Sequence, residues 1–383
     1  MRSHYRCSEC GSRYPVAPDL MLCPSCSRQQ EPHRPLRGIL EVVLEERMPP
    51  AASPLELLPV DARFFPPIPV GNTPLWRPRR LREKLGFPNL CLKDDGLNPT
   101  GSLKDRASYL VAAFAAQHGI SRIAVASTGN AGSSMAGIGA AAGIAVTLFI
   151  PRNAPPAKLI QARQYGAELV LVDGNYDAAY DMCLDYAAAE KVLSRNTAHN
   201  PMTIEGKKTA ALEIIRQLDR SPDCLFVSAG DGVILGGTFK GFRDARDAGT
   251  IREIPRIFAV QAEGSSAICR AFESGDFGPP APASTVADSL AVDVPRGGYY
   301  ALKQLRENGG ACVTVSDEQI LKAQRELAAE CGLFAEPAAA AALAGFRCVR
   351  GSIPAEAVVV LLITGSGLKD TAAAEKALEA DNS

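Results

Sequence analysis

The sequence has almost no net charge and no long apolar run. Its 41 lysine and arginine residues nearly balance 42 aspartate and glutamate residues, so the formal charge is −1 at pH 7. A chain of this kind has no general electrostatic attraction to nucleic acid or to an anionic membrane. The longest membrane-like stretch, 135–150, is short for a membrane span and is dominated by glycine and alanine. This pattern favours a packed helix that ends at Gly143 and is followed by a buried strand, and we expect neither a nucleic-acid nor a membrane partner.

The first residues also lack the pattern of a secretory signal, because Arg2 and Arg6 are not followed by an apolar segment. We therefore expect a cytoplasmic protein. Its 383 residues, 46% apolar and 22% charged, are enough for two packed α/β lobes and a small appendage. Apolar runs of strand length alternate with helical stretches, which is typical of mostly parallel sheets. The expected strands are 90–93, 123–126, 145–150, 168–172, 224–227, 257–261 and 358–363, and the clearest helices are 105–118, 176–190 and 205–219.

Four of the eleven cysteines form two pairs with the spacing of a metal site. Cys7 and Cys10 are separated by two residues, as are Cys23 and Cys26, while the other seven cysteines are scattered. Four thiolates can close a tetrahedral zinc site that holds a short segment in shape without a large hydrophobic core, and such a site has no open position for catalysis. We expect a structural zinc-ribbon-like module at 1–36, and catalysis largely independent of it. Two reduced pairs without metal are the alternative.

A proline- and alanine-rich linker or arm is expected at 37–69, and the main body of two lobes at 70–383, with the smaller lobe roughly at 105–205. Within the body, the stretch 96–106 places Lys104 among small, turn-forming residues, where a long flexible amine has no packing task. This lysine is therefore a candidate for covalent attachment of an aldehyde cofactor. A solvated surface lysine is the alternative.

Three further clusters of small and polar residues follow apolar runs. Ser127, Thr128, Gly129 and Asn130 precede a helical stretch, where free backbone N–H groups can bind an anion. The glycines of 230–234 let main-chain amides close around a phosphate. The stretch 364–370 follows the last buried strand. Each cluster lies at the carboxyl end of an expected strand, which is where open α/β sheets place their ligands.

Taken together, these motifs resemble the threonine synthase family of pyridoxal-phosphate enzymes, whose fold is called fold type II and is tryptophan synthase beta-like. The resemblance covers roughly 70–375 in order. It includes the segments 204–211 (Ile-Glu-Gly-Lys-Lys-Thr-Ala-Ala) and 334–340, and the ending Thr-Gly-Ser-Gly-Leu-Lys-Asp at 364–370. It implies two three-layer lobes with mostly parallel sheets, a homodimer, and conversion of O-phosphohomoserine and water to threonine and phosphate.

The resemblance also implies a role for each candidate residue. Lys104 forms a Schiff base with pyridoxal 5'-phosphate and moves protons at the substrate's Cα and Cβ. Asn130 binds the cofactor's phenolic oxygen, and Thr364 its ring nitrogen. A helix N-cap and a strand-end hydroxyl are the structural alternatives for these two. The phosphate is bound by Gly230, Asp231, Gly232, Val233 and Ile234. The amino-acid substrate is bound by Ser127, Thr128 and Asn175.

Two positions depart from the family pattern. Glu168 stands where relatives carry a basic residue, and a carboxylate there opposes a phosphorylated substrate. Asp231 lies inside the phosphate cradle and needs either to turn away or to meet a cation such as Lys240. Two other readings therefore stay open. One is an enzyme of β-elimination or β-replacement on another amino acid, such as a threonine or serine dehydratase or a cysteate synthase-like protein. The other is a non-catalytic binding protein.

Overall fold

The computed structural model describes residues 3–45, 53–154 and 156–380 and divides the chain into two compact units. One comprises Met1–Gln30, Leu36–Gly71 and Lys104–Thr209, and we call it the small-sheet unit. The other comprises Glu31–Pro35, Asn72–Leu103 and Ala210–Ser383, and we call it the large-sheet unit. None of the described helices is both long and apolar enough to cross a membrane. The boundaries expected from the sequence, with a separate module at 1–36, stay a prediction.

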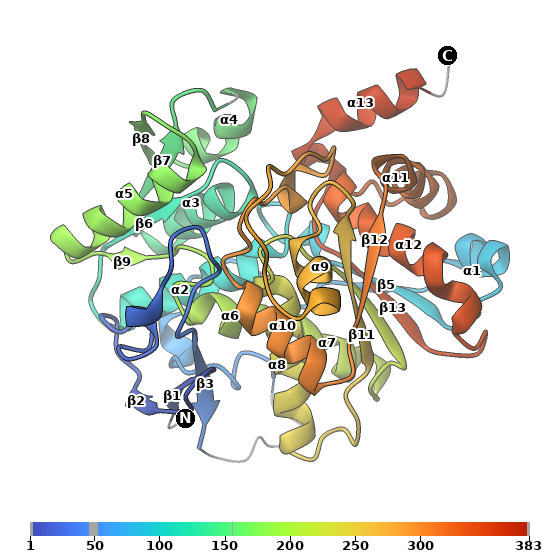
Figure 1. Ribbon diagram of the computed structural model, residues 1–383, viewed down its shortest axis with the longest axis horizontal. Coiled ribbons are helices and arrows are strands. Elements are labelled where there is room, and N and C mark those ends of the chain that lie inside the picture. The colour runs from blue at the N-terminus through green and yellow to red at the C-terminus, as the bar shows by residue number, and fades with distance from the viewer. Residues whose placement is uncertain (1–2, 46–52, 155, 381–383) are drawn as a thin grey trace. The chain divides into compact units, whose positions relative to one another are not determined.

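The small-sheet unit contains a three-stranded antiparallel sheet in the order β2-β1-β3 and a four-stranded parallel sheet in the order β8-β7-β6-β9 (Figure 1). Its elements are β1 (Ser3–Cys7), β2 (Arg13–Pro15), η1 (Ser27–Gln29), β3 (Leu40–Leu44), η2 (Ala62–Phe64), α2 (Lys104–Gln117), β6 (Arg122–Ala126), α3 (Asn130–Ala142), β7 (Ala145–Pro151), α4 (Pro156–Gln164), β8 (Glu168–Val172), α5 (Tyr176–Ala189), β9 (Leu193–Ser194) and α6 (Met202–Lys207).

Alternation along β6 explains why this parallel sheet is covered on both faces. Ile123 and Val125 pack into a core that includes residues of α2 and α3, whereas Ala124 and Ala126 pack into a second core with residues of α5. Successive side chains of a strand point to opposite faces, so these two cores lie on opposite sides of the sheet. The unit is a helix–sheet–helix sandwich of the kind that parallel sheets require.

The large-sheet unit is built on one six-stranded sheet in the order β12-β11-β10-β13-β5-β4, parallel except for β4. Its elements are β4 (Leu75–Trp76), α1 (Arg79–Leu85), β5 (Leu90–Asp94), η3 (Asp95–Leu97), α7 (Thr209–Leu218, whose first residue belongs to the small-sheet unit), β10 (Cys224–Ser228), α8 (Val233–Asp247), β11 (Arg256–Ala262), α9 (Ala267–Ser274), η4 (Asp288–Leu290), α10 (Gly298–Glu307), β12 (Ala311–Val315), α11 (Asp317–Cys331), α12 (Pro337–Val349), η5 (Arg350–Ser352), β13 (Val359–Ile363), η6 (Gly367–Lys369) and α13 (Thr371–Ala380).

Both faces of the large sheet are buried as well. Phe226 and Leu361 belong to a core with residues of α1, α11 and α12, while their neighbours Leu225 and Leu362 are fully buried on the other face. The two units confirm the α/β class predicted from the sequence, with all seven expected strands present. The helix expected at 205–219 is divided into α6 and α7, and β12 was not anticipated.

Candidate active site

The carboxyl end of β13 fixes the chain just before Lys104. The backbone oxygen of Thr364 accepts a hydrogen bond from the Leu103 amide at 2.8 Å, and Ser102 forms an antiparallel bridge with Gly365. Thr364 itself is buried. Lys104 follows Leu103 directly and is the first residue of α2. The candidate lysine therefore directly follows a residue that is hydrogen-bonded to Thr364, and Thr364 is the residue expected to bind the cofactor's ring nitrogen.

The loop after β10 is packed too tightly to accept side chains at two of its glycines. A Cβ atom at Gly230 would lie 2.9 Å from the backbone oxygen of Ser289, and one at Gly232 would lie 2.9 Å from the Ala301 Cβ. Gly232 also has a φ of +86° and is the N-cap of α8. Glycine is required there because other residues adopt this backbone conformation only with strain. The loop places the first amides of α8, those of Val233 and Ile234, at the carboxyl edge of the sheet, as a phosphate cradle requires.

Asp231 turns its carboxylate onto the start of the same helix. Its Oδ1 accepts a hydrogen bond from the Val233 amide at 2.9 Å, and its backbone oxygen accepts one from the Gly297 amide at 2.8 Å. Lys240, the cation considered from the sequence, donates to Asp244 at 2.6 Å, one turn along α8. The carboxylate thus occupies one of the amides that a phosphate at this loop would need.

Two serines at the carboxyl edge of the large sheet, for which the sequence predicted no role, show whether a polar cofactor fits there. The hydroxyls of Ser102 and Ser228 are buried and have no hydrogen-bond partner among the described residues. Ser102 lies beside Gly365, and Ser228 ends β10, the strand next to β13. A buried hydroxyl without a partner is costly. These two positions therefore fit a polar group bound at this edge, and only their burial, which the motif does not reveal, identifies them.

In the small-sheet unit, the segment between β6 and α3 forms a helix start whose geometry suits an anion. Gly129 is the N-cap of α3, and its amide donates to the Ser127 Oγ at 3.2 Å. The backbone segments pack closely here, because a Cβ atom at Gly132 would lie 2.4 Å from the Ser127 backbone oxygen. Thr128 is half-buried and Asn130, the first residue of α3, is buried. The helix dipole and the first-turn amides favour a negatively charged ligand at this point.

Asn175 lies at the same edge of this sheet, after β8. It is exposed and is the N-cap of α5, where its Oδ1 accepts a hydrogen bond from the Ala178 amide at 3.1 Å. The structure therefore places Asn175 with Ser127, Thr128 and Asn130 at one sheet edge. Thr364 and the 230–234 loop lie at the carboxyl edge of the other sheet, in the large-sheet unit.

Glu168 lies at the opposite edge, which corrects the expectation that it opposes a bound phosphate. It is the first residue of β8, is 61% exposed, and pairs with Arg122, the first residue of β6, at 2.6 Å. Its Oε2 also accepts a hydrogen bond from the Thr147 hydroxyl at 3.3 Å. In a parallel sheet, residues that begin strands lie at the amino edge, away from the carboxyl edge where ligands bind.

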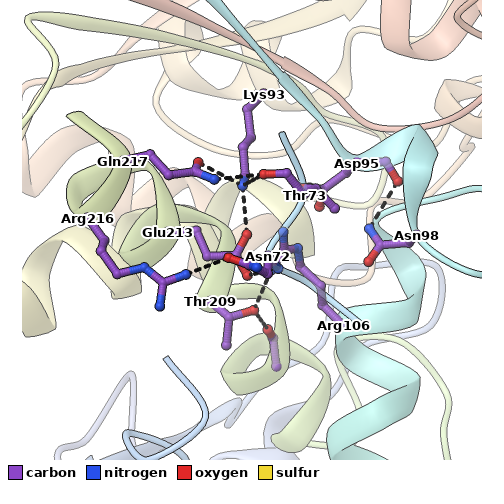
Figure 2. Close-up of polar contacts among 11 residues, drawn as sticks. Asn72, Thr73, Lys93, Asp95, Asn98, Arg106, Thr209, Glu213, Arg216 and Gln217 are labelled. Carbon is purple, nitrogen blue, oxygen red and sulfur yellow. Dashed lines mark hydrogen bonds and ion pairs between the residues drawn. The ribbon is translucent and has the colours of Figure 1, made fainter. Parts of the chain in front are cut away.

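A buried ion pair stabilises the turn that opens the large-sheet unit. Figure 2 shows the Lys93 Nζ, which is fully buried, bonded to the Glu213 Oε2 at 2.6 Å, to the Thr73 backbone oxygen at 2.7 Å and to Gln217 at 3.0 Å. The Asn72 amide donates to the other oxygen of Glu213 at 2.6 Å. These bonds hold the 72–73 turn between β5 and α7. The charges are compensated, as burial requires.

The four cysteines of the N-terminal module converge. Their sulfur atoms all lie within 4.8 Å of one another, with Cys7 at 3.8 Å from Cys26 and Cys10 at 3.7 Å from Cys23. Thiolates around one tetrahedral zinc ion, each about 2.3 Å from the metal, lie about 3.8 Å apart. The donor set and its spacing therefore fit a single structural zinc ion.

Comparison with known proteins identifies the family. Residues 68–365 match the family described as "Pyridoxal-phosphate dependent enzyme". This chain belongs to that family. It is 35% identical to the threonine synthase of Methanosarcina acetivorans, over 96% of this chain and 92% of that protein. It is 34% identical to the threonine synthase of Methanocaldococcus jannaschii, over 98% and 95%. These matches span nearly the whole chain, so they extend into the cysteine module.

Solved structures agree in fold. The chain resembles the processed form of threonine deaminase isoform 2 from Solanum lycopersicum with a TM-score of 0.71 and 22% identity, over 88% of this chain and 96% of that one. It resembles maize serine racemase with a TM-score of 0.69 and 20% identity, over 82% and 94%. At these identities the likeness shows the fold, which is the fold type II class predicted from the sequence.

Proposed function

We propose that this chain is a threonine synthase that converts O-phosphohomoserine and water to threonine and phosphate with pyridoxal 5'-phosphate as its cofactor. The observation that carries the proposal is the similarity to two threonine synthases over at least 92% of each protein, which leaves no large part of either relative without a counterpart. The carboxylate of Glu168, which argued against a phosphorylated substrate, lies at the amino edge of the small sheet and is paired with Arg122.

The cofactor, when bound, withdraws electrons from the substrate's Cα. The chain's own residues do the rest. Lys104 is half-buried at the start of α2, where its flexible amine can hold the cofactor, then take protons from Cα and Cβ, and return protons at Cγ and Cα. Phosphate leaves from Cγ, and the oxygen of water is added at Cβ. The helix start at Ser127, Thr128 and Asn130 suits the substrate's carboxylate. The neutral hydroxyl of Thr364 suits an uncharged ring nitrogen.

The remaining assignments belong to the same proposal. Gly230, Asp231, Gly232, Val233 and Ile234 bind the cofactor's phosphate. Asn130 binds its phenolic oxygen, and Asn175 contributes to the substrate site. One zinc ion is held by Cys7, Cys10, Cys23 and Cys26. We expect the enzyme to work in the cytoplasm as a homodimer.

Product analysis tests the proposal. The purified protein is incubated with O-phosphohomoserine, and phosphate and threonine are measured together, with serine, threonine and O-phosphoserine as the comparison panel. We expect equal amounts of phosphate and threonine from O-phosphohomoserine, and much slower reaction of the panel. Formation of 2-oxobutyrate from threonine, without phosphate release from O-phosphohomoserine, would establish the dehydratase alternative instead.

A further inference from the structure

The cysteine module shares a hydrophobic core with the helix that begins at Lys104. Tyr5 of β1 and Leu40 of β3 are fully buried in the same core as Leu110 and Phe114 of α2 and Met202 of α6. Cys7, Cys23 and Cys26 belong to this core as well. The module is therefore part of the packing of the small-sheet unit. Whether catalysis is independent of it, as expected from the sequence, stays a prediction.

Helix α6 is pressed against the first turn of α2. A Cβ atom at Gly206 would lie 2.3 Å from the Arg106 backbone oxygen and 2.9 Å from the Ala107 Cα, so only glycine fits at this crossing. The Thr209 hydroxyl accepts a hydrogen bond from the Arg106 side chain at 3.0 Å and donates to the Gly206 backbone oxygen at 2.8 Å. Arg106 is two residues after Lys104, so a shift of α6 is transmitted to the lysine.

The residue before this crossing, Glu205, is a fully buried carboxylate. It forms an ion pair with Lys208, whose side chain is also fully buried. Such a pair is held in a fixed geometry only while water is excluded, because the attraction between the charges weakens greatly in a high dielectric.

The module covers this region from the other side. β3 contacts α6, and the Tyr5 hydroxyl of β1 is buried without a hydrogen-bond partner among the described residues. The β1–β3 sheet thus lies over the buried ion pair of α6.

We propose that Glu205 is a positioning residue for Lys104, and that the cysteine module, closed by its metal ion, supports it. The module excludes water from Glu205 and holds α6 against α2, and we call this support the brace. This inference rests on the proposed function in one respect, namely that Lys104 holds the cofactor. It assigns the module a task in the chemistry although none of its four cysteines lies near the cofactor motifs in the sequence. Loss of the metal loosens β1 and β3, admits water to Glu205 and displaces the start of α2.

Glu205→Gln tests the positioning role with the module intact. This change removes the charge at nearly constant volume. We expect normal zinc content and a shift of about half a unit or more in the pH midpoint of the cofactor's absorption band. We also expect kcat to fall by about ten-fold or more, with KM changed by less than about three-fold.

Glu326→Gln is the matched control, since Glu326 is a buried helical glutamate paired with Arg347 and Lys84 in the large-sheet unit. It should lower Tm without moving the band.

Cys23→Ser combined with Cys26→Ser tests the brace, with Cys312→Ser combined with Cys348→Ser as the control outside the module. The first variant should lose its zinc and show the same band shift and the same fall in kcat as Glu205→Gln. If it does not fold, the parent protein stripped of zinc with a chelator takes its place, and the same band shift and fall in kcat are expected.

A zinc-free variant with the parent's band and kcat would overturn the brace. A Glu205→Gln protein with a lower Tm and an unchanged band would reduce Glu205 to a structural residue. The band titration needs no substrate, so its outcome is independent of which amino acid is turned over. If borohydride reduction of the parent leaves Lys104 unlabelled, the proposed function itself fails.

Discussion

The Nη1 of Arg122 lies 2.6 Å from the Oε2 of Glu168, joining the first residues of β6 and β8 at the amino edge of the small sheet. The pair raises the pKa of Arg122, chiefly through the hydrogen bond to Glu168. A carboxylate neutralised in this way, at the edge opposite to Ser127 and Asn130, adds little repulsion to a substrate phosphate bound at the carboxyl edge.

Replacing Glu168 with lysine tests this placement. We expect KM for O-phosphohomoserine to change by less than about two-fold, because the charge is exposed and screened from the ligand edge. Stability should fall by about 0.5–1 kcal/mol, since a surface ion pair is lost and the new ammonium group would face the like charge of Arg122. Steady-state kinetics at low and high salt, together with denaturant unfolding, would check both points. A several-fold fall in KM at low salt would return Glu168 to the phosphate site.

The sequence could predict the elements and the lysine motif, but not the contacts that a substituted residue makes. The strand at 168–172 was expected, and so its first residue could have been placed at the amino edge from topology alone. The motif comparison suggested instead that Glu168 opposes a phosphorylated substrate. The salt bridge to Arg122 joins residues that are far apart in the sequence and has no local signal.

Burial was the second property that the sequence could not provide. The four-cysteine spacing predicted a metal site, and the sulfur geometry fits it. Whether this module was an appendage or part of the core depended on long-range packing of Tyr5 and Leu40 with α2 and α6. The pattern of a short segment cannot encode such contacts. The orphaned hydroxyls of Ser102 and Ser228 were hidden for the same reason.

Lys104→Ala should abolish turnover while leaving the fold intact. The lysine is half-buried at the start of α2, and its proposed roles are covalent and acid-base. We expect kcat to fall by about a thousand-fold or more, the borohydride-trapped cofactor to disappear, and Tm without cofactor to stay within about 2 °C of the parent. Lys303→Ala is a suitable control, because that lysine is 40% exposed and lies on α10. Activity within about ten-fold of the parent would remove Lys104 from the mechanism.

Ser102→Ala should weaken cofactor binding without lowering the stability of the cofactor-free protein. The hydroxyl is buried and has no partner among the described residues, so removing it costs the cofactor-free protein nothing and relieves an unsatisfied polar group. If a polar ligand completes it, the variant should bind pyridoxal 5'-phosphate about five- to ten-fold more weakly, equivalent to about 1 kcal/mol. Ser228→Ala is the parallel test at the end of β10. Unchanged cofactor affinity in both variants would mean that these hydroxyls do not contact the cofactor.

Asp94→Asn should make the protein more stable at neutral pH than at acid pH, relative to the parent. Asp94 ends β5 beside Ile363 of β13, and its Oδ1 accepts a hydrogen bond from the Gly96 amide at 3.1 Å. Burial raises its pKa from 3.8 to about 6; the hydrogen bond from the Gly96 amide opposes this effect, and smaller contributions come from the charge of Asp95, which raises the pKa, and that of Lys93, which lowers it.

The sign of the pH dependence follows from this raised pKa. Between about pH 4 and pH 6 the folded protein holds more protons at Asp94 than the unfolded chain, so stability falls as the pH rises through that window. Above it, the buried charge costs at most about 3 kcal/mol. Asparagine can still accept the Gly96 hydrogen bond but has no charge to bury. The difference in Tm between variant and parent, measured by calorimetry of the cofactor-free proteins, should therefore be near zero at about pH 4 and rise by a few degrees, about 2–4 °C, by about pH 7. A difference that stays constant across this range would show that Asp94 is ionised at no cost and that its carboxylate reaches water.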